Sequence, residues 1–364
     1  MADVNRILVT NRVQAPATVL TASSVLGSAP VAWLKDQLRS KTWRSAIGWT
    51  IVAGFNDKID FNRSGVKVAT LTAGTYATGA DLAAHIVARL EAADATPVWA
   101  CSYSGSTFKF TISSDLSFTL LWGSGANTGT ACHKDLGWAA SDTGASTSQV
   151  ATNAAYTSRH WVKADLGSAL AVRAGIAVNH NAGAGGTFTL QGNATDAWTA
   201  PSVTQALAGD ASIRIAFLGA DQTYRYWRLL IDDCGNALGY GEVGVWFAGP
   251  YTQPSASFAE GWGKIPQAQN SVGFTKSGAH FVDVYPERPV WTPIGWRGLT
   301  AAQRDAIMNA FASVSTGVCF FFAFNAVDAP TATEYVFLDQ PISFKNTAGM
   351  LYIVEAPTLL GALG

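Results

Sequence analysis

Charge is scarce in this sequence. Only 13% of its 364 residues are Asp, Glu, Lys or Arg, against the roughly 25% that is usual in soluble domains. The formal net charge is −1, so the chain has no broad electrostatic footprint for nucleic acid. With 13 Trp and 18 Phe as well, we expect other chains to cover much of its surface. The alternative is a large β protein rich in Gly and Thr.

Cysteine and long apolar runs are also rare. The four Cys residues lie far apart and form no CxxC pair, which predicts buried thiols and no disulfide scaffold; they are Cys101, Cys132, Cys234 and Cys319. The longest apolar run, residues 318–324, is far shorter than the roughly 20 residues that cross a bilayer. The start MADVNRILVT lacks the basic and apolar regions of a secretory signal. We therefore expect a soluble protein, made in a reducing cytoplasm, that does not insert into membranes.

Composition and periodicity divide the chain into three parts, all mainly β. Residues 1–52 and 150–250 supply about the eight strands of a jelly roll, and we expect them to form one β-sandwich. Residues 53–149 interrupt it and predict a small α+β domain, with a helix that begins at Thr78 in a capping-box pattern. Residues 255–364 predict a C-terminal β-sandwich or barrel with one helix, which begins at Thr300.

Signatures of enzymes are missing. No GxSxG, HExxH or P-loop pattern occurs, so the sequence predicts a protein without catalytic activity and without a cofactor. One acidic set could hold Ca²⁺, although no DxDxDG loop is present and ion pairs or a solvated loop are the favoured alternative; it consists of Asp221, Asp232, Asp233 and Glu242. A second set, His160, Asp165 and His180, could ligate a metal or act as a general base, but His180 between two Asn residues is more typical of a strand end. We therefore predict no metal site.

Aromatic residues in loops are the best candidates for binding. Trp198 lies in NATDAWTAPS and Tyr240 in GNALGY, and both are expected at the loop end of the sandwich. Asn193 and Asp196 are close enough in sequence to hydrogen bond a sugar or a partner that stacks on Trp198. The alternative is that Trp198 packs on a neighbouring subunit or closes the end of the sandwich.

A second candidate surface lies in the segment YPERPVWTPIGWRG. It combines cations and aromatic rings between prolines, in Arg288, Trp291, Trp296 and Arg297. Arg and Trp are enriched at interface hot spots, so this segment predicts contact with a neighbouring subunit. The alternative is a structured turn in which Arg stacks on Trp.

Taken in order, these parts resemble the tail-tip proteins of tailed bacteriophages. The discoidin-like module of phage tail proteins is similar to ATVLTASSVLGSAPVAWLKDQLRSKTWRS, WVKADLG, IAVNHN and RYWRLLIDD…GYGEVGVWFAG. A small module that recurs in tail and adsorption proteins is similar to IDFNRSG…LTAGTYATGADLAAHIVARLEAA…LGW. The ring-forming part of distal tail proteins resembles NSVGFTKSGAHFVDVYPERPVWT, LTAAQRDAIMNAFAS and YIVEAP. That part follows the appendage here, which departs from the family's order.

The resemblance implies a structural protein of the virion, placed in the tail tip and assembled in the cytoplasm of the bacterial host. Its C-terminal part would form a ring of six copies, or of three at a hub. The ring would link the tail tube to the hub and dock receptor-binding proteins or fibres. The discoidin-like domain and its insert would project outward. The alternative is an adhesin that binds host surface glycans through the discoidin-like loops.

Overall fold

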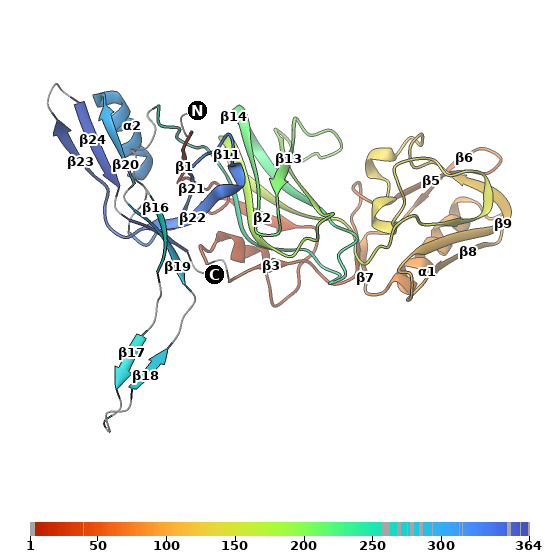
Figure 1. The fold of residues 1–364 in the computed structure, drawn as a ribbon. Coiled ribbons are helices and arrows are strands. Elements are labelled where there is room, and N and C mark those ends of the chain that lie inside the picture. The colour runs from red at the N-terminus through yellow and green to blue at the C-terminus, as the bar shows by residue number, and fades with distance from the viewer. Residues whose placement is uncertain are drawn as a thin grey trace.

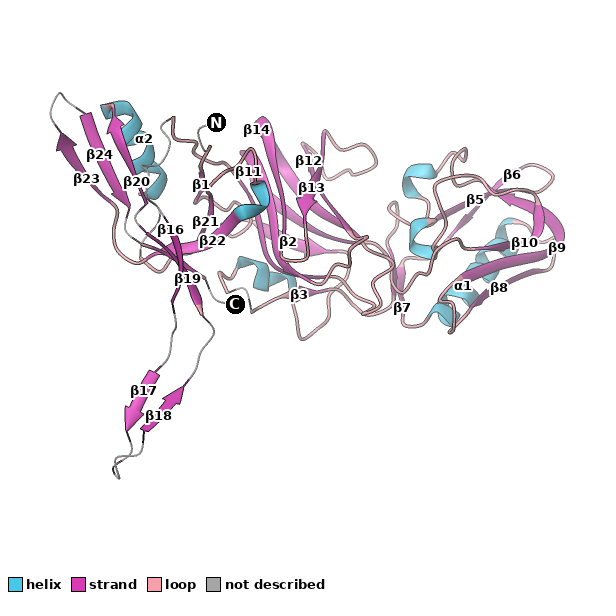
Figure 2. Ribbon diagram, viewed as in Figure 1, coloured by secondary structure: helices cyan, strands magenta, loops and turns pink. Residues whose placement is uncertain are grey.

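The fold is mainly β, as the sequence predicts, and its strands gather in three bodies that follow one another in a row (Figures 1 and 2). The computed structural model describes residues 4–38, 40–255, 263–267, 271–274, 276, 280–283, 287–292, 294–312, 314, 316–347, 351–356 and 358–362. Two α-helices lie in the described residues, one in each outer body.

The middle body is a seven-stranded antiparallel sheet that folds over its own core. Two long strands, β11 (His160–His180) and β14 (Ile213–Asp232), pair along most of their length, with register shifts that bend them. The remaining strands are β2 (Val19–Ala22), β3 (Trp43–Arg44), β12 (Thr187–Asn193), β13 (Val203–Gly209) and β15 (Glu242–Gly249). Trp43, Trp227 and Trp246 are fully buried in its core. A short 3₁₀ helix, η1 (Val31–Lys35), packs beside β15.

The insert is a small α+β body whose helix packs on its strands. Helix α1 (Gly79–Ala93) begins where the sequence predicts, because Thr78 and Asp81 exchange the hydrogen bonds of a capping box. It buries Leu82, Ile86 and Leu90, spaced four residues apart. The strands are β4 (Trp49–Ile51), β5 (Lys58–Asn62), β6 (Val66–Thr70), β7 (Gly74–Tyr76), β8 (Trp99–Tyr103), β9 (Phe110–Leu120) and β10 (Ser146–Val150), with the 3₁₀ helices η2 (Thr128–Thr130) and η3 (Lys134–Leu136).

The C-terminal body combines a six-stranded sheet, a three-stranded sheet and helix α2 (Ala301–Phe311). Thr300 and Gln303 form the predicted capping box, and Ile307 and Phe311 are buried. The strands are β16 (Gly263–Gln267), β19 (Arg288–Thr292), β20 (Ile294–Leu299), β21 (Phe320–Ala323), β22 (Thr333–Leu338), β23 (Ser343–Thr347), β24 (Leu351–Ala356) and β25 (Leu359–Gly361), with η4 (Pro330–Ala332).

The first strand, β1 (Arg6–Leu8), pairs with β21 at the edge of this C-terminal sheet. Residues 1–52 are therefore shared among three bodies, because β1 joins the C-terminal body, β2 and β3 the middle one and β4 the insert. β1 is held at this edge because the side chains on both of its faces are buried. Ile7 packs in the C-terminal core and Leu8 in the core between the C-terminal and middle bodies. The other predicted boundaries remain predictions.

Candidate functional site

A long hairpin, here called the arm, leaves the C-terminal body. It consists of β16, β17 (Ser271–Phe274), β18 (His280–Asp283) and β19. Gln267 lies opposite Arg288 in the β16–β19 pair, and Ser271 lies opposite Asp283 in the β17–β18 pair. The second pair therefore continues the first with nearly the same register. β19 pairs with β25, whereas, within the part of the chain that the structure describes, β17 and β18 pair with each other alone and lie away from the body (Figure 1).

The base of the arm carries a groove of about 580 Å³. Ile265, Val290 and Leu360 supply apolar lining, and Arg288 and Asp339 supply opposite charges. Ile265 is 58% exposed on β16, the outermost strand of the sheet. An edge strand presents unpaired backbone groups to another chain, so this groove and edge form a surface that a further strand could cover.

The four residues predicted to contact a neighbouring subunit divide into two groups. Arg297 is exposed, and the Arg288 guanidinium stacks on Phe337 at 5.3 Å from the ring centroid. Trp291 and Trp296, in contrast, are only 2% and 0% exposed. The large apolar rings fill the core of their own C-terminal body, which corrects the expectation that they contact another subunit.

The loop after β12 does bring together Trp198, Asn193 and Asp196. Trp198 Nε1 donates to Asp196 Oδ1 at 2.7 Å, and Asn193 Nδ2 donates to the Ala197 carbonyl at 2.6 Å. Asp196 also pairs with Lys163 at 2.5 Å. Burial raises the pKa of Asp196, but hydrogen bonds from Lys163 and Trp198 outweigh it and hold the pKa below its usual range. The loop is therefore held by its own polar groups.

The Trp198 ring is half-buried and one side of it is occupied. The buried Arg228 guanidinium lies 4.5 Å from the Trp198 centroid and 5.3 Å from the centroid of Phe55, which belongs to the insert. Burial, together with the nearby positive charge of Arg159, lowers the pKa of Arg228 to about 10. Trp198 is thus part of a stacked contact between the middle body and the insert.

Tyr240 does not join Trp198. Asn193 lies opposite Tyr226 and Thr187 opposite Asp232, so the connections after β12 and after β14 leave this strand pair in opposite directions. The Tyr240 ring lies 5.5 Å from the Arg44 guanidinium instead. Trp198 and Tyr240 therefore lie at opposite ends of the strand pair, and not at one loop end of the sandwich as the sequence predicts.

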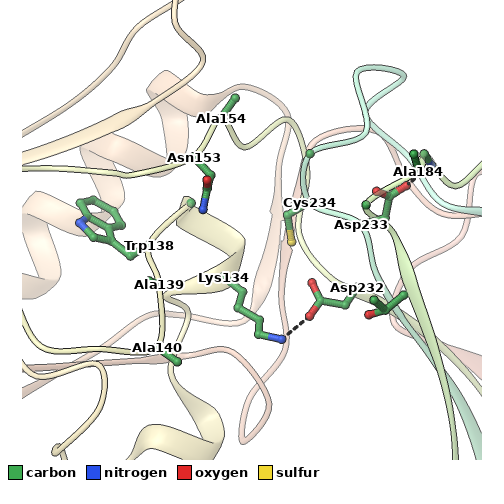
Figure 3. A pocket seen from close by; sticks show the side chains of 15 residues that line it. Lys134, Trp138, Ala139, Ala140, Asn153, Ala154, Ala184, Asp232, Asp233 and Cys234 are labelled. Atoms are coloured by element: carbon green, nitrogen blue, oxygen red, sulfur yellow. Dashed lines mark hydrogen bonds and ion pairs between the residues drawn. The ribbon is translucent and has the colours of Figure 1, made fainter. Parts of the chain in front are cut away.

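A cleft of about 580 Å³ separates the insert from the middle body. Lys134 and Asp232 form an ion pair across it (Figure 3). Gly183 N donates to Asp233 at 3.0 Å. Burial raises the pKa of Asp233. Trp138 is buried and its ring points away from the cleft (Figure 3), so it offers no face for a sugar. Nothing in the sequence near Lys134 signals this contact, because Asp232 is distant in the chain.

One Ser–His pair has the spacing of a nucleophile and its base but no access to solvent. Ser45 Oγ lies 3.2 Å from His160 Nε2, and the two residues are 0% and 1% exposed. Ser45 Oγ accepts from Gly241 N, and Thr157 Oγ1 also contacts the His160 ring. Burial lowers the pKa of His160 to about 3. The pair is a buried polar contact that no substrate can reach.

The two polar sets considered as metal sites are dispersed. Each of the seven members has a different partner. Asp232 pairs with Lys134, Asp233 with Gly183, Glu242 with Arg44, Asp221 with Arg173, Asp165 with Arg225, His180 with the Asp210 carbonyl, and His160 with Ser45 and Thr157. Within the described ranges, no group of three or more His, Cys, Asp or Glu side chains could hold a metal ion. The same part of the chain contains no helix long and apolar enough to span a membrane.

No protein-family model matches this chain, and no curated protein does either. One solved structure with some likeness is the family 32 carbohydrate-binding module of C. perfringens NanJ in complex with galactose, with 7% identity, a TM-score of 0.29 and coverage of 68% of this chain and 98% of that one. CpGH89CBM32-5 from Clostridium perfringens, in complex with GalNAc-β-1,3-galactose, has 6% identity, a TM-score of 0.28 and coverage of 66% and 100%. Chitosan-binding module 1 of a Paenibacillus chitosanase/glucanase has 19% identity, a TM-score of 0.21 and coverage of 27% and 74%. None of these three is a phage tail protein, and at these TM-scores none identifies the function of this chain.

Proposed function

We propose that this protein is a non-catalytic structural component of a larger assembly, a ring in a bacteriophage tail tip, whose copies contact one another through the arm. The arm carries the proposal. Two strands that pair only with each other are marginally stable in water, and β17 and β18 lie away from the body that anchors them. A neighbouring copy would supply the surface that such a ribbon needs.

Other features of the C-terminal body support contact between copies. Apolar side chains are exposed on strands at or near its sheet edges, with Ile265 58%, Phe344 49% and Leu351 41% exposed. The arm of one copy would lie on a different surface of the next, which is a heterologous contact, and such contacts form a ring when the rotation from copy to copy closes. The insert lies at the opposite end of the molecule (Figure 1), so it would point away from a ring built from C-terminal bodies.

The particle mass tests this proposal directly. Light scattering with negative-stain imaging of the full chain should give six or three times 38.3 kDa and a closed ring. Replacing residues 268–287 with a two-residue Asn-Gly turn, which suits a tight hairpin, should leave a folded monomer. A monomer at every concentration of the full chain, or a ring that persists without the arm, would contradict the proposal.

A matched pair of point variants locates the contact. Ile265 and Val66 are both β-branched, both on edge strands and 58% and 64% exposed, but Val66 lies in the insert. Ile265→Lys should weaken the oligomer because it places a charge at the base of the arm, whereas Val66→Lys should not. Equal effects of the two variants would refute a contact at the arm.

Glycan recognition by the middle body is the second candidate. It rests on the loop that gathers Trp198, Asn193 and Asp196, since a ring beside hydrogen-bonding groups is what sugar stacking requires. Trp198→Ala should abolish binding to glycans displayed on an array and leave the particle mass unchanged. Tyr240→Ala is the matched control, because Tyr240 lies away from this loop. No glycan bound by the unaltered protein, or binding that survives Trp198→Ala, would rule out this site.

A further inference from the structure

Two arginines stack on one tyrosine where the middle and C-terminal bodies meet. The guanidinium carbons of Arg6 and Arg173 lie 4.5 Å and 4.6 Å from the centroid of the Tyr251 ring. Arg6 also lies 4.3 Å from the centroid of Phe217, which packs edge-on against Tyr251 at 5.6 Å. By these distances the two guanidinium carbons are at most about 9 Å apart.

Backbone pairing holds these side chains in place. Ile7 and Thr252 exchange two backbone hydrogen bonds of 2.9 Å, which set Arg6 beside the segment that contains Tyr251. Arg173 lies at the register shift between Val172 and Ala174 in β11. A bulge of this kind redirects a side chain out of the regular alternation of a strand. The cluster is therefore fixed by three segments that are distant in the sequence.

The donors of this cluster have few acceptors. Arg6 Nε donates to Gln253 Oε1 at 3.1 Å, and the nearest carboxylate to Arg173 belongs to Asp221, 4.0 Å away and 57% exposed. In the described part of the chain, no carboxylate lies within ion-pair distance of Arg6, and the Tyr251 hydroxyl has no hydrogen-bond partner. Burial lowers the pKa of Arg6, Tyr251 raises it, and the charge of Arg173 lowers it further. Arg6 thus has no carboxylate partner, and Arg173 has only the long contact with the exposed Asp221.

Arg225 shows the same stacking with its charge satisfied. Its guanidinium lies 5.0 Å from the Tyr226 centroid, and it also makes two hydrogen bonds to Asp165, of 2.7 and 2.8 Å. A carboxylate thus fills the place that has no carboxylate beside Arg6 and that Asp221 approaches only to 4.0 Å beside Arg173. The comparison indicates that an anion from outside the chain would complete the cluster.

We propose that Arg6, Arg173 and Tyr251 form a binding site for a phosphate group. Two guanidinium groups and a phenol offer donors to three or more oxygen atoms and two units of positive charge, which match a phosphate better than a carboxylate. The phosphate is either free or an ester on a larger molecule. This site is separate from the arm and from the Trp198 loop, so it does not depend on either proposed function.

The test uses the full chain at constant ionic strength. Inorganic phosphate is titrated while ³¹P line broadening is followed, and dimethyl phosphate and acetate are titrated in parallel by competition. Arg6→Gln together with Arg173→Gln should weaken phosphate binding at least tenfold, and Tyr251→Phe, which keeps the ring and removes the hydroxyl, should weaken it a few-fold. Arg225→Gln is the matched control and should bind phosphate as the unaltered protein does.

The outcomes separate the alternatives. Competition by dimethyl phosphate as strong as that of phosphate identifies an ester on a polymer as the source, and weaker competition identifies the free ion; both support the site. The inference is overturned if acetate competes better than either phosphate, if the unaltered protein does not bind phosphate, or if binding survives the double substitution. Tyr251→Phe decides the matter if the double variant does not fold, because unchanged affinity in that variant also overturns it.

Discussion

Removing one partner of the buried Arg159–Asp135 pair should destabilise the junction between the insert and the middle body. Asp135 is 0% and Arg159 9% exposed. Arg159 donates to both Asp135 oxygens, through its backbone N at 2.6 Å and through Nε and Nη2 at 3.1 and 2.8 Å. Asn56 Nδ2 adds a bond of 3.1 Å to the same carboxylate. Arg159→Met therefore leaves a buried charge with only part of its hydrogen bonds.

Breaking a buried pair in this way costs about 3–5 kcal/mol. In bodies of this size that corresponds to a fall in melting temperature of roughly 6–20 °C. The assay is urea unfolding followed by Trp fluorescence, with Asp135→Leu, Arg159→Met and both together. We expect the double variant to lose less than the sum of the single variants, because neither charge then remains buried alone.

Arg225→Gln serves as the control for this cycle, since Arg225 and Asp165 form an exposed pair, and exposed pairs contribute little to stability. Its unfolding midpoint should not move. The reasoning would be refuted if Arg159→Met cost less than about 1 kcal/mol, well below the range for a buried pair, or if the two single effects simply added.

The remaining expectations concern pH, thiols and one turn. Burial lowers the pKa of His160 to about 3 and of His133 to about 4. Because the folded-state pKa is lowered, the stability that each neutral His contributes is present above about pH 6.5 and is lost as the pH falls toward 4. Urea midpoints should therefore be flat above pH 7 and decline below it, and a midpoint that rises between pH 6 and 4 would contradict this. Burial also raises the pKa of Cys132 and Cys234, so neither should react with a thiol reagent until the protein unfolds, which mass spectrometry of the native adduct would check. Gly137→Ala should lower the melting temperature by several degrees, because φ is +85° and the added Cβ would lie 2.3 Å from the Asn153 carbonyl oxygen. Gly54→Ala is the control for backbone strain alone, since φ is +71° there and the added Cβ would meet nothing within 4 Å.

Local signals were sufficient for the two helices and insufficient for the sheets. Thr78 with Asp81, and Thr300 with Gln303, form their capping boxes as the sequence predicts, because each box is decided within four residues. The place of β1 is different. Its pairing with β21 joins segments near opposite ends of the chain, and three apolar-rich residues carry no periodicity that would reveal such a partner.

The same difference between local and long-range signals applies to the candidate sites. Trp198, Asn193 and Asp196 are neighbours in the sequence, and the structure keeps them together. The sequence could not decide whether Trp291 and Trp296 lie in a core or at an interface, since Trp is typical of both. Their packing within the C-terminal body shows that both are buried.

The arginine cluster shows why a net charge is a poor guide to a single site. A value of −1 for the whole chain argues against broad attraction of polyanions, and that argument still holds. The net charge, however, averages over distances much longer than the Debye length of roughly 8 Å at physiological salt. Beyond that length one exposed charge scarcely affects another. Arg6 and Arg173 both stack on Tyr251, whereas Arg225 has Asp165 in contact. What distinguishes them is the local partner of each guanidinium, and that is set by a bulge in β11 and by the bridge between Ile7 and Thr252.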